Sequence, residues 1–229
     1  MDIAEIFDQN VSEYEAWYHE YPFVFQSEVE ALREMLPAGD QLSGIEVGLG
    51  TGKFAQALGI KEGVEPSAKM REIAIKRGIE ILDGYAENLP YKDVRFNFVL
   101  MNFCIIYFKS LKKPFKEAFR VLKNDGVLLV GFIDRNSPIG KAYELRKLDS
   151  DFYRTAKFYS VEKVMFELSE VGFKHFEYRQ TLFHPLDEIV SFEPSKPGYG
   201  EGSFVVIKAM KKAPLPEVKG NAYRQAFFY

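Results

Sequence analysis

The stretch EVGLGTGKF, residues Glu46 to Phe54, has glycines at positions 48, 50 and 52 and ends in a lysine and a phenylalanine. Glycines at every second position let the backbone approach a ligand closely. A P-loop requires G-x-x-x-x-G-K-[ST]. When Lys53 takes the lysine position, Val47 replaces the first glycine and Phe54 replaces the hydroxyl residue that binds magnesium. Both requirements fail, so the stretch is not a P-loop.

The dinucleotide fingerprint G-x-G-x-x-G fits little better. With Gly48 and Gly50 as its first two glycines, the third falls on Lys53, where the helix should pack against the strand without a side chain. A nicotinamide-dependent oxidoreductase therefore remains only a less favoured alternative. Glu46 would repel a pyrophosphate, but it suits a ligand that carries an ammonium group and no phosphate.

Short apolar runs alternate with helical patterns from residue 42 onward, which is typical of βαβ units in a parallel sheet. The pattern predicts strands at 44–48, 63–66, 78–84, 95–103 and 127–133, followed by an antiparallel pair near 173–183 and 202–210. We therefore predict an α/β fold with a doubly wound, Rossmann-like sheet of seven strands. This sheet is mostly parallel, its last strand is antiparallel, and an N-terminal helical cap precedes it.

Three further blocks follow the glycine loop in a fixed order. The block GVEPS ends the second strand with Glu65, GYAENLPY follows the third strand from Gly84 to Tyr91, and FRVLKNDGVLLVGF covers a helix and the fifth strand. Together with the loop, these blocks resemble the class I S-adenosylmethionine-dependent methyltransferases of the small-molecule type. The resemblance extends from about residue 43 to residue 210.

The resemblance implies S-adenosylmethionine as the cofactor. In that family the glycine loop wraps the methionine part, an acidic residue at the position of Glu65 accepts hydrogen bonds from both ribose hydroxyls, and the backbone near Ala86 meets the adenine. Related sequences often carry aspartate where Tyr85 stands, so its contact with the adenine amino group is either lost or replaced by stacking or by Glu87. The candidate cofactor-binding residues are Glu46, Gly48, Gly50, Gly52, Glu65, Pro66, Met70, Tyr85, Ala86, Glu87 and Asn102.

We expect a single methyltransferase domain over residues 1–229, and the changes of pattern along the chain divide it into segments. Its segments are a helical cap (1–40), a cofactor-binding core (43–133), an insertion or lid (134–158), a helix with the C-terminal strand pair (159–210) and a tail (211–229). Ser27, followed three residues later by Glu30, predicts a helix N-terminus inside the cap. The tail has no period and is expected to lie loosely on the surface.

The sequence contains fewer indications of the methyl acceptor than of the cofactor. Methyl transfer from a sulfonium requires no universal catalytic side chain, so no catalytic residue is predicted, and a base is needed only for a protonated nucleophile. Candidate substrate residues are Tyr14, Trp17, Tyr18, His19 and Phe103. For the aromatic residues of the cap, packing onto the sheet is the alternative, and for His19 it is a solvated surface position.

Asn102 ends the fourth strand, next to the point where ligands bind in open α/β sheets. The alternative is a polar strand end that caps a nearby turn. Nucleobase and some protein amide methyltransferases carry an Asn/Asp-Pro-Pro-aromatic motif at this place, whereas this chain has NFCI. Both acceptor classes are therefore disfavoured.

The composition of the chain argues against several classes of binding partner. The 229 residues carry 30 lysines and arginines against 33 acidic residues, a net charge of −3 without a long basic run, which argues against a nucleic-acid groove or an anionic membrane surface. The single cysteine, Cys104, cannot form an internal disulfide, and no cysteine/histidine cluster has zinc-site spacing, so no metal is expected. The N-terminus lacks the basic and apolar regions of a signal peptide, which favours the cytoplasm.

These observations predict an enzyme that methylates nitrogen or oxygen of a small molecule. A cofactor-binding module or partner subunit without its own turnover is the alternative. The identity of the acceptor and the oligomeric state are not encoded in any pattern that we can interpret.

Overall fold

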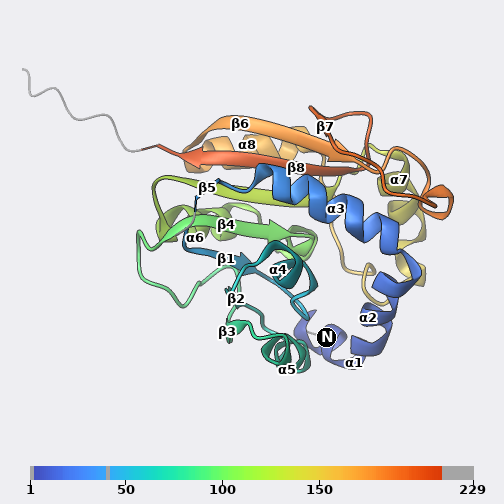
Figure 1. Cartoon of the computed structure of the whole chain (residues 1–229), viewed down its shortest axis with the longest axis horizontal. Coiled ribbons are helices and arrows are strands. Elements are labelled where there is room, and N and C mark those ends of the chain that lie inside the picture. The colour runs from blue at the N-terminus through green and yellow to red at the C-terminus, as the bar shows by residue number, and fades with distance from the viewer. Residues whose placement is uncertain (1–2, 40–41, 213–229) are drawn as a thin grey trace, which may run out of the picture.

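Helices and strands alternate along most of the chain, as the sequence predicts. The computed structural model describes residues 3–39 and 42–212 (Figure 1), so the prediction for the tail lies almost wholly outside the described residues. The strands are β1 (Gly44–Val47), β2 (Glu62–Val64), β3 (Glu80–Leu82), β4 (Phe96–Asn102), β5 (Leu122–Ile133), β6 (Phe173–Thr181), β7 (Lys196–Pro197) and β8 (Phe204–Lys211). The helices are α1 (Ile3–Gln9), α2 (Val11–Glu20), α3 (Pro22–Met35), α4 (Lys53–Leu58), α5 (Ala68–Lys76), α6 (Lys112–Val121), α7 (Pro138–Arg146) and α8 (Val161–Val171), with short 3-10 helices η1 (Cys104–Tyr107), η2 (Lys147–Asp149) and η3 (Leu186–Glu188).

The strands form one sheet in the order β3-β2-β1-β4-β5-β8-β6-β7. The pairs from β3 to β5 are parallel, and β8 is antiparallel to both β5 and β6. The predicted Rossmann-like sheet with an antiparallel last strand is confirmed. The sheet has one more strand than predicted, because β7 is a two-residue edge strand within a turn-rich loop. A lysine followed by a proline gives no strand pattern there.

Both faces of the sheet are covered, which explains the continuous apolar runs of β4 and β5. Successive side chains of a strand point to opposite faces. Val99 and Met101 accordingly join the core that contains α6 and α8, whereas Phe98 and Leu100 join the core beneath α3 and α4 (Figure 1).

The cap begins its last helix earlier than the sequence suggests. Helix α3 starts at Pro22, and the Ser27 hydroxyl lies inside it, donating a hydrogen bond of 2.7 Å to the carbonyl of Phe23. The predicted N-cap at Ser27 is therefore wrong. Proline at the first helical position already has the required φ, and a serine inside a helix can bond the preceding turn instead of capping.

Three helices form the predicted N-terminal cap, and α1 and α2 lie beyond the carboxyl ends of the parallel strands (Figure 1). The 134–158 segment contains α7 and η2. Within residues 3–39 and 42–212, no helix has the length and apolar character needed to span a membrane.

Candidate functional site

A cavity of about 1310 Å³ opens where strand order reverses between β1 and β4. The carboxyl ends of β1, β2 and β4 meet at this edge, and open α/β sheets bind ligands at such a reversal. Its wall also includes side chains from the cap and from the 134–158 segment. The cavity therefore joins parts of the chain that are far apart in sequence.

The glycine loop forms one wall and requires glycine for two reasons. Gly48 and Gly50 have φ values of 68° and 57°, a region that L-residues rarely adopt. A Cβ atom at Gly48 would lie 2.7 Å from Cβ of Cys104, and one at Gly50 would lie 2.8 Å from the Tyr14 hydroxyl. The backbone is thus exposed to the cavity without side chains of its own.

Gly52 serves a different purpose. It lies outside the cavity wall, and its φ is 79° at the start of α4. A Cβ atom there would lie 2.4 Å from Cδ1 of Ile79. Gly52 is therefore required by packing of the loop against the residues after α5. Met70 is likewise outside the wall and fully buried in the protein.

Two buried polar side chains at strand ends face the cavity and carry atoms without a hydrogen-bond partner. Glu46 is 2% exposed and Asn102 is 4% exposed. Oε2 of Glu46 and both amide atoms of Asn102 have no hydrogen-bond partner among the described residues. Burial raises the pKa of Glu46 well above its usual range. Because an unpaired buried polar atom is costly, this arrangement fits a polar ligand that donates and accepts hydrogen bonds here.

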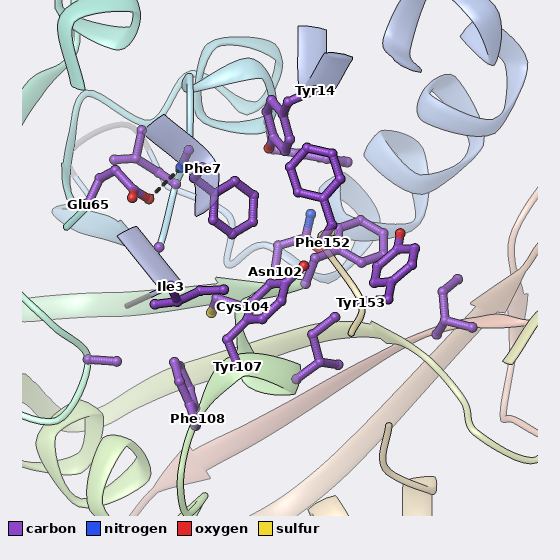
Figure 2. Close-up of a pocket in the computed structure, with 18 of the residues that line it drawn as sticks. Ile3, Phe7, Tyr14, Glu65, Asn102, Cys104, Tyr107, Phe108, Phe152 and Tyr153 are labelled. Atoms are coloured by element: carbon purple, nitrogen blue, oxygen red, sulfur yellow. Dashed lines mark hydrogen bonds between the residues drawn. The ribbon is translucent and has the colours of Figure 1, made fainter. Parts of the chain in front are cut away.

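Glu65 follows β2 and also points into the cavity (Figure 2). One carboxyl oxygen accepts a hydrogen bond of 2.8 Å from the amide of Gly50, and the other accepts one of 2.8 Å from the amide of Ser67. Burial, as the largest influence, raises the pKa of this carboxyl. Each oxygen still has a lone pair available, so the residue fits a ligand with two neighbouring hydroxyls.

The remaining predicted cofactor residues lie along the same wall. Pro66, Tyr85, Ala86 and Glu87 all line the cavity. Ala86 is buried, whereas Tyr85 is 42% exposed at the rim. The structure thus brings together nine of the eleven candidates, leaving out Gly52 and Met70.

Four aromatic rings from four segments cover the cavity, and we call them the aromatic roof: Phe7, Tyr14, Tyr107 and Phe152 (Figure 2). The Phe7 ring centroid lies 5.4 Å from that of Tyr107, 5.3 Å from that of Phe152 and 5.9 Å from that of Tyr14. Sequence reasoning identified only Tyr14. The others come from α1, η1 and the segment after η2, and no spacing rule links these segments.

Two acidic residues fasten the cap to the glycine loop and to α5. Glu15 accepts a hydrogen bond from the Thr51 hydroxyl and pairs with Nη2 of Arg77 at 2.6 Å. Asp8 accepts from the Ser67 hydroxyl at 2.5 Å and from the amide of Lys69 at 3.0 Å. The roof is therefore held directly over the predicted cofactor wall.

The opposite wall consists of side chains from α2, α3, the 134–158 segment and the loop after β6. Three of the predicted substrate residues, Trp17, Tyr18 and Phe103, line the cavity and also pack against the core beneath α3, whereas His19 is exposed and lies outside the wall. The Tyr18 hydroxyl donates a hydrogen bond of 2.8 Å to that of Tyr14. Sequence reasoning missed Glu28, which lines this wall and is 1% exposed.

Comparison with known proteins agrees with this geometry. A family model for a methyltransferase domain matches residues 45–130. An uncharacterised protein of Methanocaldococcus jannaschii is 43% identical over 206 residues, which cover 90% of this chain and 98% of that protein. A demethylmenaquinone methyltransferase of Chlorobaculum tepidum is 35% identical over 108 residues, covering 43% of this chain and 45% of its own.

One solved structure is similar over nearly the whole chain. It is a SAM-dependent methyltransferase of Thermotoga maritima, described as a possible histamine N-methyltransferase, with 46% sequence identity and a TM-score of 0.88. The match covers 92% of this chain and 100% of that one. The chain therefore belongs to the S-adenosylmethionine-dependent methyltransferases and is an enzyme that uses this cofactor.

Proposed function

We propose that the enzyme transfers the methyl group to a nitrogen or oxygen atom of a small molecule bound in the cavity. The continuity of the cavity is the observation that carries this proposal. One space of about 1310 Å³ is lined by the predicted cofactor residues and by the aromatic residues of the cap. Ligand pockets commonly measure about 300–1,000 Å³, so this volume is consistent with a cofactor and an acceptor side by side.

The cofactor residues have distinct roles in this proposal. Glu46, Gly48 and Gly50 bind the methionine end, Glu65 and Pro66 bind the ribose, and the stretch 85–87 binds the adenine. The unpaired carboxyl oxygen of Glu46 and the place of Gly48 and Gly50 in the cavity wall support the first assignment. The free lone pairs of Glu65 support the second. Gly52, Met70 and His19 have no role in binding here.

Bound S-adenosylmethionine supplies an activated methyl group, so the residues of this chain have to position the acceptor and exclude water. The aromatic roof is suited to keeping water out of the cavity. The buried amide of Asn102 can orient a polar group of either ligand. Burial raises the pKa of the Tyr14 hydroxyl above its usual range, so this hydroxyl holds its proton and acts as a hydrogen-bond donor.

Transfer of a labelled methyl group tests the proposal. The protein would be incubated with methyl-labelled cofactor and a panel of small amines, phenols and carboxylic acids. We expect label on at least one compound, and we expect Glu65→Ala to abolish the transfer. Cofactor binding without label on any compound would contradict small-molecule methylation and favour a module without its own turnover.

A further inference from the structure

Glu28 occupies a position that packing alone would give to an apolar side chain. The buried face of α3 includes Val24, Glu28, Leu32 and Met35 at helical spacing, and this face packs against the sheet. Residues spaced by three or four along a helix share one side. The carboxyl group of Glu28 therefore lies in the middle of an otherwise apolar stripe.

One oxygen of this carboxyl lacks a hydrogen-bond partner within residues 3–39 and 42–212. Glu28 is 1% exposed, and its Oε2 atom has no hydrogen-bond partner among the described residues. Burial raises its pKa well above the usual range, and no neighbouring cation acts against that rise. An unpaired polar atom in an apolar environment lowers stability. Its presence at the cavity wall therefore indicates a ligand rather than a role in folding.

Three tyrosines of the same cavity wall lie close enough to this carboxyl for its charge to influence them. Burial is the main reason for the raised pKa values of Tyr18, Tyr143 and Tyr153, and the charge of Glu28 contributes to each rise. The rings of Tyr143 and Tyr153 stack with centroids 4.9 Å apart. Ring faces attract cations, particularly where water is excluded.

The cationic side chains of the cavity wall lie elsewhere. They are Lys109 and Lys113, after η1, and Lys157, at the end of the 134–158 segment. None of these influences the pKa of Glu28. The end of the cavity around Glu28 is thus acidic and aromatic, without a counter-charge from the described residues.

We propose that Glu28 binds a positively charged amino group of the methyl acceptor, so that the acceptor is a small amine with an apolar or aromatic body. This inference rests on the proposed function, because it names the acceptor class of the same cavity. A charge-assisted hydrogen bond from the ammonium group to the carboxylate satisfies the unpaired oxygen, and the tyrosine rings cover the rest of the cation.

Proton release accompanies such binding and gives a specific readout. Without ligand, burial raises the pKa of Glu28 and thereby favours its neutral form. An arriving ammonium group favours the ionised carboxyl, so about one proton leaves Glu28 for each amine bound. A carboxyl that merely supported the fold would not release a proton on ligand binding.

Calorimetry with matched probes tests the inference. The probes are benzylamine, 2-phenylethylamine and 4-phenylbutylamine, each compared with the alcohol and the carboxylate of the same skeleton, in the presence of S-adenosylhomocysteine. We expect at least one amine to bind roughly tenfold more tightly than its two matches. Titration in two buffers of different ionisation enthalpy should then show release of about one proton.

Variants of α3 separate the possible outcomes. Glu28→Gln should remove both the amine preference and the proton release, whereas Glu30→Gln, on the same helix but outside the cavity wall, should preserve both. The inference is overturned if no amine is preferred, or if preference and proton release persist in Glu28→Gln. Failure of cofactor binding or of methyl transfer in the labelled assay would instead contradict the proposed function, so the two failures are distinguishable.

Discussion

The two ends of the cavity are built in different ways. At the cofactor end, backbone at the carboxyl ends of β1 and β2 forms the wall, and its glycines are required by φ values and by close contacts. At the acceptor end, side chains from α2, α3 and the 134–158 segment meet across long stretches of sequence. The first end is determined locally, whereas the second depends on how the cap packs on the sheet.

The largest expected effect concerns the cofactor end. Glu65→Ala removes both carboxyl oxygens proposed to bind the ribose, and hydrogen bonds to a charged group contribute about 1.5–3 kcal/mol each. We expect affinity for S-adenosylhomocysteine to fall about 100-fold or more, measured by titration calorimetry. Glu62→Ala, at the other end of β2 and paired with Arg95, is the control and should bind normally. Equal affinities for the two variants would show that Glu65 does not bind the ribose.

The next largest effect is the loss of stability when a side chain is added at a glycine of the loop. Gly48 and Gly59 both have positive φ, but a Cβ atom at Gly59 would meet nothing within 4 Å. Gly59→Ala should cost about 1–2 kcal/mol of unfolding free energy through backbone strain alone. Gly48→Ala should cost more, about 3 kcal/mol, because Cβ of Cys104 lies in the way. Urea unfolding measures both, and similar losses would show that the loop is not tightly packed.

The acceptor end should influence how the free energy of unfolding depends on pH. Folding raises the pKa of Glu28 above its ordinary value of 4.5, so the folded protein keeps a proton that the unfolded chain loses. Its contribution to stability is complete below about pH 4.5 and is lost as pH rises toward the folded pKa. Relative to Glu28→Gln, the wild type should lose up to about 1.4 kcal/mol per pH unit in this range.

Unfolding by urea at pH 5, 6 and 7 measures this difference. Tyr18, Tyr143 and Tyr153 face the same region, but their raised pKa values lie well above this pH range. A constant difference between wild type and Glu28→Gln over the three pH values would mean that Glu28 is not held in its neutral form by burial.

The smallest effect concerns the attachment of the cap. Asp8 accepts hydrogen bonds from Ser67 and Lys69, and the bond from the Ser67 hydroxyl is the main reason for its lowered pKa. Asp8→Asn should increase amide hydrogen exchange in α1 about threefold, because local opening becomes easier. Asp125→Asn, which alters an exposed pair with Lys212, should have no such effect. Unchanged exchange in Asp8→Asn would show that the aromatic roof holds the cap without this contact.

Sequence reasoning succeeded where local pattern determines structure. Alternating strands and helices and the glycine loop follow from spacing over a few residues, and the family resemblance indicated Glu65, which lines the cavity. The same reasoning placed a helix start at Ser27, because the capping pattern does not reveal that Pro22 already starts α3. It also missed β7, whose two residues form a strand only because β6 lies beside them.

The acceptor end was less predictable for a physical reason. Glu28 sits in a helix among other charged residues, and only the packing of α3 on the sheet shows that its carboxyl is buried. The ring contacts of Phe7 with Tyr107 and Phe152 join residues separated by about 100 positions or more. Gly52 shows that a local pattern can also mislead. This glycine lies within a predicted binding loop, but it is required for packing against Ile79.

A crystal structure with S-adenosylhomocysteine tests the division of the cavity most directly. We expect the homocysteine end of the ligand to lie against Gly48 and Gly50, its ribose to bind Glu65, and open space to remain from Asn102 toward Glu28. A ligand that fills the region around Glu28, or that leaves Glu65 without contact, would contradict the division of the cavity into a cofactor end and an acceptor end.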